Sequence, residues 1–131
     1  MKYLLDTYIL LGITSMPERI RKSRAAISII ENSNNELYIN SLVILEISGL
    51  LLKGAVEFAF SLDDYVNKEL PKYRIGILPL EIVHILHSSL LPNIHGDPFD
   101  RVYIAHSILS RFPIISNDRI IPEYPGVKVV W

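Results

Sequence analysis

Four acidic side chains, far apart in the chain, could together carry out metal chemistry: Asp6, Glu46, Asp100 and Asp118. Each one alone is typical of a helix cap or a turn. Gathered without an equal number of Lys or Arg, they would repel one another unless a divalent cation supplied the missing positive charge. Magnesium prefers oxygen ligands and commonly binds only one or two carboxylates directly, which leaves positions for phosphate oxygens. A bound ion would polarise a phosphoryl oxygen and lower the pKa of a bound water, so the predicted chemistry is phosphodiester hydrolysis.

A fifth acid, Asp97, competes with Asp100 for the third place, because both lie in one short segment. Asp100 precedes Ile104 by one helical turn and should point along the same side, so it is preferred. Asp97 directly precedes Pro98, which is typical of a helix cap.

Basic residues could contact the phosphates of a substrate. One dense group contains Arg19, Arg21, Lys22 and Arg24, and it either contacts a nucleic-acid backbone or forms a solvated helix face. Arg101 and Arg119 each adjoin a proposed metal-site acid, where they could hold the scissile phosphate or pair with a neighbouring carboxylate.

Histidines offer a weaker alternative. His84 and His87 are three residues apart on a predicted helix, a spacing that suits a transition metal, but apolar neighbours favour packing or surface exposure. His95 precedes the acidic segment and could contact phosphate, although a role in shaping its loop is favoured.

Short apolar runs alternate with segments of helical periodicity along the whole chain. We predict strands at 3–5, 37–39, 74–78, 114–115 and 127–130, and helices after Asp6, at 18–31, from Ser41 to about 52, at 55–69, from Pro79 to about 90, and at 99–111. This alternation predicts an α/β domain with a mainly parallel sheet, right-handed connections and helices on both faces. In such sheets, sites form beyond the carboxyl ends of the strands.

The composition indicates one small domain spanning residues 1–131. Half of the residues are hydrophobic, and the absence of cysteine excludes disulfides and thiol catalysis. Thirteen basic against 14 acidic residues give a net charge of -1, so any contact with nucleic acid must come from a local patch. No apolar run approaches the length of a membrane span, and we expect a soluble cytoplasmic protein.

Several motifs resemble the PIN-domain ribonucleases, particularly the VapC-like toxins of toxin–antitoxin pairs. They are Leu4-Leu5-Asp6-Thr7, the segment Ser41–Ile47, the box His95-Gly96-Asp97-Pro98-Phe99-Asp100-Arg101, Ser116-Asn117-Asp118, and the valine-rich strand before Trp131. The resemblance spans essentially the full length of the chain, and the box from His95 to Arg101 is its most specific motif. Where the family often has an arginine before the fourth acid, this chain has Asn117.

The resemblance implies a PIN-like three-layer α/β/α fold and a metal-dependent endoribonuclease. It places Asp6, Glu46, Asp100 and Asp118 in an acidic cluster around magnesium or manganese, with Thr7 and Ser116 as supporting hydroxyls. It also implies an RNA substrate, a homodimer and a cognate antitoxin laid across the apolar segments 42–52 and 55–62. Ordinary core packing is the alternative explanation for those segments.

Two other functions are compatible with parts of the sequence. A binding module could keep the fold and recognise RNA or a protein without cutting, although the presence of all four acids argues against it. A phosphatase could use Asp6 as a nucleophile, but the second aspartate expected two residues later is missing, because position 8 is Tyr.

Overall fold

A single five-stranded sheet runs through the molecule, in a computed structural model that describes residues 1–131. Its order is β3-β2-β1-β4-β5 and every neighbouring pair is parallel, so the predicted mainly parallel sheet is confirmed. The strands are β1 (Lys2–Leu5), β2 (Glu36–Asn40), β3 (Ile75–Leu78), β4 (Ile114–Ile115) and β5 (Val129–Val130).

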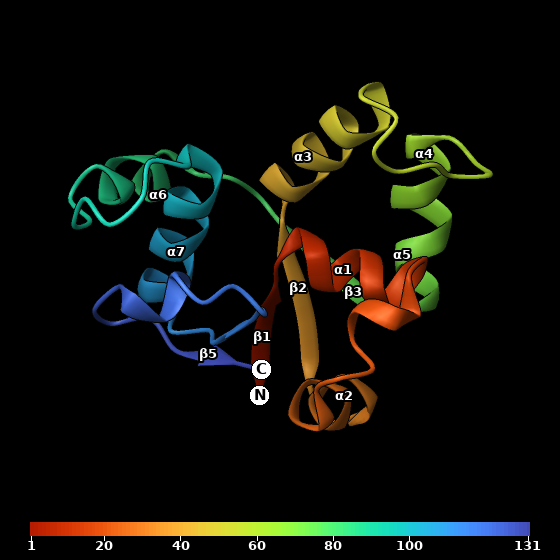
Figure 1. The fold of residues 1–131 in the computed structure, drawn as a ribbon, viewed down its shortest axis with the longest axis horizontal. Helices are drawn as coiled ribbons and strands as arrows, with labels where there is room; N and C mark the ends of the chain where they lie inside the picture. Colours follow the sequence, from red (N-terminus) through yellow and green to blue (C-terminus); the bar gives the residue numbers. More distant parts are fainter.

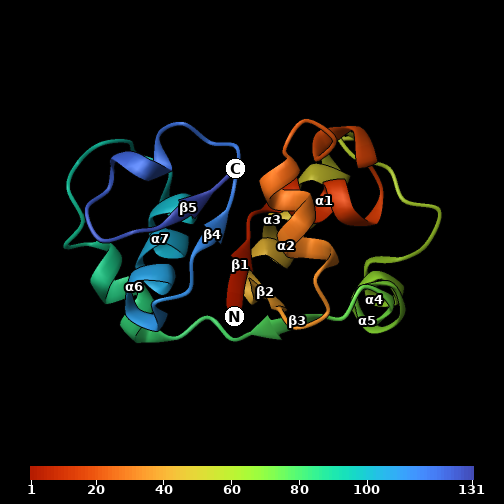
Figure 2. The same ribbon diagram turned by 90° about the horizontal axis from the view of Figure 1, so that it is seen from below.

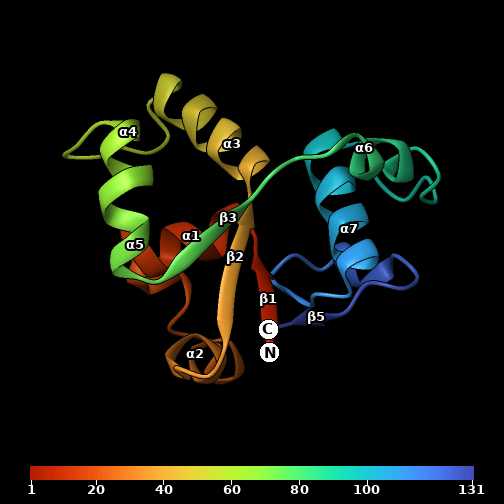
Figure 3. The same ribbon diagram turned by 180° about the vertical axis from the view of Figure 1, so that it is seen from behind.

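Helices cover both faces of this sheet, as expected for parallel strands. One face carries α1 (Thr7–Thr14), α2 (Arg24–Glu31), α3 (Ser41–Leu52), α4 (Leu62–Asp64), the π-helical η2 (Tyr65–Glu69) and α5 (Leu70–Lys72) (Figures 1 and 2). After β3 an extended segment leads to the opposite face, which α6 (Ile82–Ser88) and α7 (Pro98–Ser110) cover (Figure 3). Short 3-10 turns, η1 (Pro17–Arg19) and η3 (Ile121–Glu123), complete the three-layer fold.

The helix predicted at 18–31 is shorter than expected. Ser23 caps α2 by accepting a hydrogen bond from the Ala26 N–H at 3.1 Å, so the helix begins at Arg24. Residues 17–19 form η1 instead, which packs against α1. A Cβ on Gly12 of α1 would lie 2.7 Å from the Ile20 side chain, so glycine is what allows this close approach.

The helix predicted at 55–69 was wrong for its first turns. Gly54 has a left-handed φ of 69°, and α4 begins only after Ser61 caps it. Between them, Phe58 and Phe60 stack on the buried ring of Tyr65 rather than joining a helix. The third shortened helix, α6, begins at Ile82 rather than Pro79.

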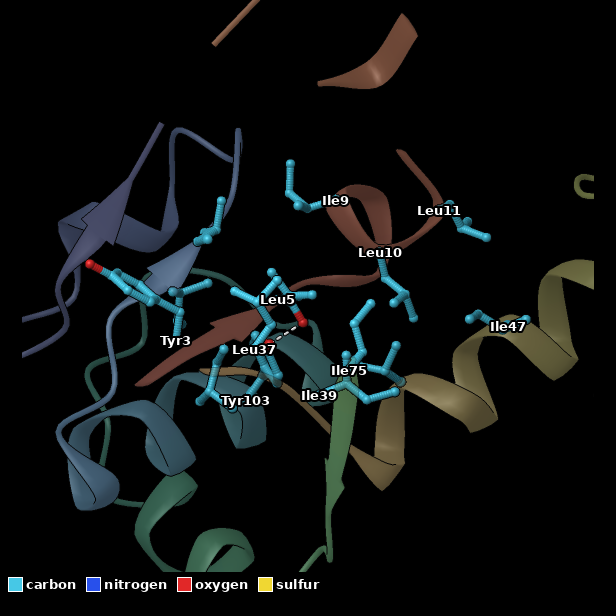
Figure 4. Packing of buried hydrophobic residues seen from close by; sticks show 14 of the residues in the cluster. Tyr3, Leu5, Ile9, Leu10, Leu11, Leu37, Ile39, Ile47, Ile75 and Tyr103 are labelled. Carbon is cyan, nitrogen blue, oxygen red and sulfur yellow. Dashed lines mark hydrogen bonds between the residues drawn. The ribbon is translucent and has the colours of Figure 1, made fainter. Parts of the chain in front are cut away.

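The hydrophobic core lies on both sides of the central strand β1. Leu4 and Leu5 are completely buried, and the Tyr103 hydroxyl of α7 donates a hydrogen bond to the carbonyl of Leu5 (Figure 4). This bond ties α7 to the end of β1, next to Asp6. None of the helices is long and apolar enough to pass through a membrane.

Apolar residues in 42–52 and 55–62 are divided between core and surface. Leu50, Phe58 and Phe60 pack against the core, which accounts for much of the apolar excess. Leu45 and Leu52 remain 59% and 88% exposed, so α3 still presents apolar surface to solvent.

Candidate active site

The carboxyl ends of β1 and β4 meet where the sheet order reverses direction. From β1 the chain first adds β2 and β3 on one side, and later adds β4 and β5 on the other. The connecting segments therefore diverge at this point and leave a crevice, which is the usual ligand site of open parallel sheets. Asp6 directly follows β1, and Asp118 comes three residues after β4.

A pocket of about 180 Å³ lies in this crevice and is lined by all four predicted acids. They come from the end of β1, from α3, from the first turn of α7, and from the loop after β4. The complete lining is Asp6, Thr7, Tyr8, Val43, Glu46, Asp100, Tyr103, Asn117 and Asp118. Acids more than 110 residues apart in the chain thus face one small space.

Backbone hydrogen bonds hold the acids of the two strand ends. Asp6 Oδ1 accepts from the Ile9 N–H at 2.7 Å, which makes this acid the cap of α1. Asp118 Oδ1 accepts from the Ile120 N–H at 2.7 Å, and the Ser116 hydroxyl accepts from the Asp118 N–H at 3.1 Å. Local turn geometry therefore positions both carboxylates.

Glu46 is oriented by a side chain from another helix. The Thr7 hydroxyl donates to Glu46 Oε2 at 3.1 Å and so joins the start of α1 to α3. Thr7 and Ser116, the two predicted supporting hydroxyls, both lie beside acids of the pocket.

Arg101 follows Asp100 in sequence, but its guanidinium forms hydrogen bonds with backbone carbonyls of the protein. It donates to the carbonyls of Pro92 at 2.7 Å, and of Ser88 and Leu91 at 2.9 Å, with longer contacts to the His95 carbonyl and the Tyr124 hydroxyl. Because these carbonyls occupy its donors, Arg101 stabilises the loop between α6 and α7. Of the two roles expected for Arg101, pairing with a neighbouring carboxylate is not observed, and the substrate contact stays a prediction.

The pocket is electrostatically unbalanced. No Lys or Arg forms an ion pair with any of its four acids, and the one basic contact is His95 Nε2, 3.5 Å from Asp100 Oδ2. Burial raises the pKa of Asp6 to about 6, although hydrogen bonds from Ser116 and Ile9 act against this rise. Burial also raises the pKa of Glu46 to about 7, and the charge of Asp100 adds to it.

Asp100 behaves in the same way. Burial raises its pKa to about 6, and the nearby charge of Asp97 adds to this effect while His95 opposes it. Carboxyls that are costly to ionise beside one another are a favourable environment for a cation.

The donor chemistry of the pocket fits a hard divalent cation, although the side chains do not form a closed cage. In their present arrangement, no three His, Asp or Glu side chains could jointly hold a metal ion. Magnesium does not require such a cage, because it usually keeps several waters and binds one or two carboxylates directly. Four carboxylates around a space of about 180 Å³ are compatible with that mode of binding.

Other predicted residues lie outside the acidic pocket. Asp97 caps α7 by accepting from the Phe99 N–H at 2.9 Å, as its position before Pro98 predicted. Lys22 and Arg119 line a neighbouring cavity, whereas Arg21 and Arg24 are exposed and line neither cavity.

The histidine pair on α6 is not arranged as a metal site. His84 is buried and stacks on His106 of α7, with ring centroids 4.0 Å apart. Its Nδ1 accepts from the backbone N–H of Glu81 at 3.1 Å. His84 therefore packs between the two helices, as its apolar neighbours indicated. The Tyr124 hydroxyl, at the end of η3, contacts the backbone N–H and Nδ1 of His95 and so anchors the loop before α7, which agrees with the favoured loop-shaping role.

Sequence reasoning missed several residues that line these cavities. Tyr103 follows Asp100 by three residues and so shares its helix face, a signal that helical spacing could have provided. Tyr8 follows Asp6 by two residues, so closeness in sequence was its signal. Trp131 carried none, because only the tertiary fold brings it to the second cavity.

Comparisons with known proteins agree with this architecture. The PIN domain family model matches residues 3–127. A VapBC2 complex from Rickettsia felis, bound to a DNA fragment from its promoter, superposes with a TM-score of 0.72 at 17% identity, covering 100% of this chain and 99% of the other. A DNA-bound VapBC from Salmonella typhimurium superposes with a TM-score of 0.65 at 20% identity, covering 99% of this chain and 97% of the other. A toxin–antitoxin complex from Klebsiella pneumoniae superposes with a TM-score of 0.60 at 15% identity, covering 98% of this chain and 96% of the other. No curated protein matches the chain significantly.

Proposed function

The chain belongs to the PIN-domain family, and from this membership we propose that it is a metal-dependent endoribonuclease that hydrolyses RNA phosphodiester bonds. The observation that carries the proposal is the pocket shared by Asp6, Glu46, Asp100 and Asp118 at the carboxyl ends of the central strands. No Lys or Arg neutralises these acids, so the site favours a cation.

The four acids would hold magnesium or manganese, which when bound would polarise the scissile phosphate and lower the pKa of a water. The protein contributes orientation. The Thr7 hydroxyl donates to one oxygen of Glu46. The backbone N–H of Ile9 donates to one oxygen of Asp6, and that of Ile120 donates to one oxygen of Asp118. The other oxygens of Glu46 and Asp118 accept no hydrogen bond from the protein and would be available to a cation or its waters. Side chains that are already held in place reduce the entropy cost of ordering the site.

Protein partners form part of the same proposal: a second copy of the chain and a cognate antitoxin. Three structures with the same fold are complexes, and one of them is a toxin–antitoxin complex. A shallow apolar hollow shared by α3, α6 and α7 supports a protein-binding role, since exposed apolar patches often mark interfaces. Leu45 of α3 and Ile85 of α6 line it, and both are exposed. Light scattering of the purified chain tests the homodimer, and co-purification with the product of a neighbouring small open reading frame tests the antitoxin.

Cleavage of mixed RNA tests the catalytic proposal. Wild type, Asp6→Asn and Asp100→Asn would be compared in manganese and in EDTA, with Asp63→Asn as the control because Asp63 is an exposed acid on α4, outside the pocket. We expect cleavage only with manganese, a loss of at least ~100-fold in both pocket variants, and wild-type activity in the control.

Three outcomes would contradict the proposal. Cleavage that survives both EDTA and the pocket substitutions would show that the assigned site is wrong. RNA binding without any cleavage would favour the non-catalytic binding module, and phosphate release from small monoesters would favour a phosphatase.

A further inference from the structure

A second cavity, of about 610 Å³, adjoins the acidic pocket. The two share Tyr8 and Asn117 in their linings, so they are neighbours on one surface. The second cavity is built from the η1 region on one side and from the end of the chain on the other. Its lining is Tyr8, Glu18, Arg19, Lys22, Asn117, Arg119 and Trp131.

Its charge is opposite to that of the acidic pocket. Arg19, Lys22 and Arg119 line it against a single acid, Glu18. None of these three cations lies within ion-pair distance of a carboxylate. They are therefore available to an anionic ligand, and their proximity to the acidic pocket suits a chain of phosphates that passes from one cavity to the other.

Arg19 is held in place at the boundary between the cavities. Its guanidinium carbon lies 4.5 Å from the centroid of the Tyr8 ring, an arrangement in which the ring stabilises the cation. The absence of a side chain at Gly12 lets η1 pack closely enough on α1 for this contact, since a Cβ there would lie 3.2 Å from Arg19 Cβ. A fixed guanidinium loses less entropy when it binds phosphate.

Trp131 supplies an open aromatic surface in the same cavity. Its side chain is 42% exposed, and its ring is not stacked on any other aromatic ring of the protein. An unpaired nucleobase can stack on such a ring, whereas the bases of a duplex already stack on one another.

We propose that this cavity binds the single-stranded RNA that flanks the cleaved bond, with phosphates on Arg19, Lys22 and Arg119 and a base stacked on Trp131. The proposal rests on the proposed ribonuclease function, and it adds the residues that would hold the strand beside the acidic pocket. Phosphate contacts and stacking do not read the sequence of bases, so the cavity would position the strand rather than select a sequence.

Binding in EDTA tests this cavity separately from catalysis. A fluorescent single-stranded 12-mer RNA would be titrated with full-length wild type, Arg19→Gln/Lys22→Gln, Arg119→Gln and Trp131→Leu, and anisotropy would be recorded at several salt concentrations. Lys53→Gln/Lys128→Gln is the matched control, because these two exposed lysines line neither cavity and replacing them changes the net charge equally.

We expect the Arg19/Lys22 double variant to bind at least ~10-fold more weakly, with a salt dependence that is shallower by roughly 0.7 for each phosphate that the variant no longer neutralises. Trp131→Leu should weaken binding of the single strand roughly 5-fold or more and leave binding of a duplex of the same sequence unchanged. The lysine control should match wild type.

The proposal is overturned if the cavity variants bind as wild type does, if the lysine control weakens binding equally, or if duplex and single strand bind alike. A failure of the nuclease proposal would appear separately, as absence of cleavage in manganese. If cleavage occurs, the cavity variants should raise KM more than they lower kcat.

Discussion

His95 Nε2 lies 3.5 Å from Oδ2 of Asp100 and is buried without a hydrogen-bond partner. The other ring nitrogen is 3.2 Å from the Tyr124 hydroxyl, so the ring is held from the side opposite to the acid. The loop that carries His95 is tied in turn to Arg101 through several carbonyls. This arrangement places a polar ring beside one carboxylate of the acidic pocket, where it can restrict the positions that Asp100 adopts.

His95→Ala should therefore weaken metal-dependent cleavage by roughly 10- to 100-fold, a reduction typical of residues that orient a metal ligand. The manganese concentration that gives half-maximal activity should rise as well, which a general loss of folding would not produce. His87→Ala is the control, because His87 lies on α6 outside the acidic pocket. Equal activity in the two variants would contradict a positioning role for His95.

Asp6→Asn should make the metal-free protein more stable at pH 8. The folded-state pKa of Asp6 is about 6, above its ordinary value of 3.8, so the folded state binds the proton more tightly. This contribution stabilises the protein at low pH and is lost as the pH rises through about 6. Removing the charge should recover about 2–3 kcal/mol. Asparagine caps a helix as well as aspartate does, so α1 should keep its first turn.

Thermal unfolding in EDTA measures this effect, and addition of manganese supplies the control. Because wild type should bind the ion and Asp6→Asn should not, manganese should reduce or reverse the difference between them. A variant that is less stable than wild type at pH 8 in EDTA would contradict the electrostatic account of the pocket.

Arg101→Lys should destabilise the protein by about 2–4 kcal/mol, because a lysine ammonium cannot satisfy carbonyls spread around a planar guanidinium. Urea unfolding measures the change, with Arg21→Lys as an exposed control. Unchanged stability would contradict the structural role of Arg101 and favour its role as a substrate contact.

His106 should make stability depend on pH in the opposite direction to the acids. Burial and the neighbouring His84 lower its pKa to about 4, and Nδ1 lies 2.8 Å from the Asn40 amide nitrogen, which can donate only to a neutral ring. The unfolded state takes up a proton first, so this contribution is full above about pH 6.5 and is lost as the pH falls towards 4.

Comparison of wild type with His106→Asn isolates this contribution, since the acids of the pocket are common to both. Denaturation between about pH 4 and pH 7 should show a smaller loss of stability on acidification in the variant. The other groups near His84 and His106 are Glu81 at the start of α6 and Asn40 at the end of β2, and both are unchanged in the comparison. Parallel pH profiles would contradict the prediction.

Sequence patterns predicted the alternating strands and helices and the parallel sheet, and placed acids at the strand ends; the resemblance to a known family assigned the four acids to one cluster. These features follow from short-range rules, since burial repeats with the period of a strand or helix and the carboxyl ends of parallel strands lie at one edge. The segment from Asp97 to Asp100 also carried its own signals, with a cap before Pro98 and the second acid within the first turn of α7.

Only the tertiary structure decided what surrounds those acids. Arg101 is adjacent to Asp100 in sequence, yet its guanidinium binds carbonyls of the preceding α6–α7 segment. Arg19 reaches the second cavity because Gly12 lets η1 pack closely on α1. Trp131 lies in the same cavity although more than 100 residues separate it from Arg19. Such contacts depend on how separate elements pack, and no local pattern of residue types encodes the distance between two side chains on different elements.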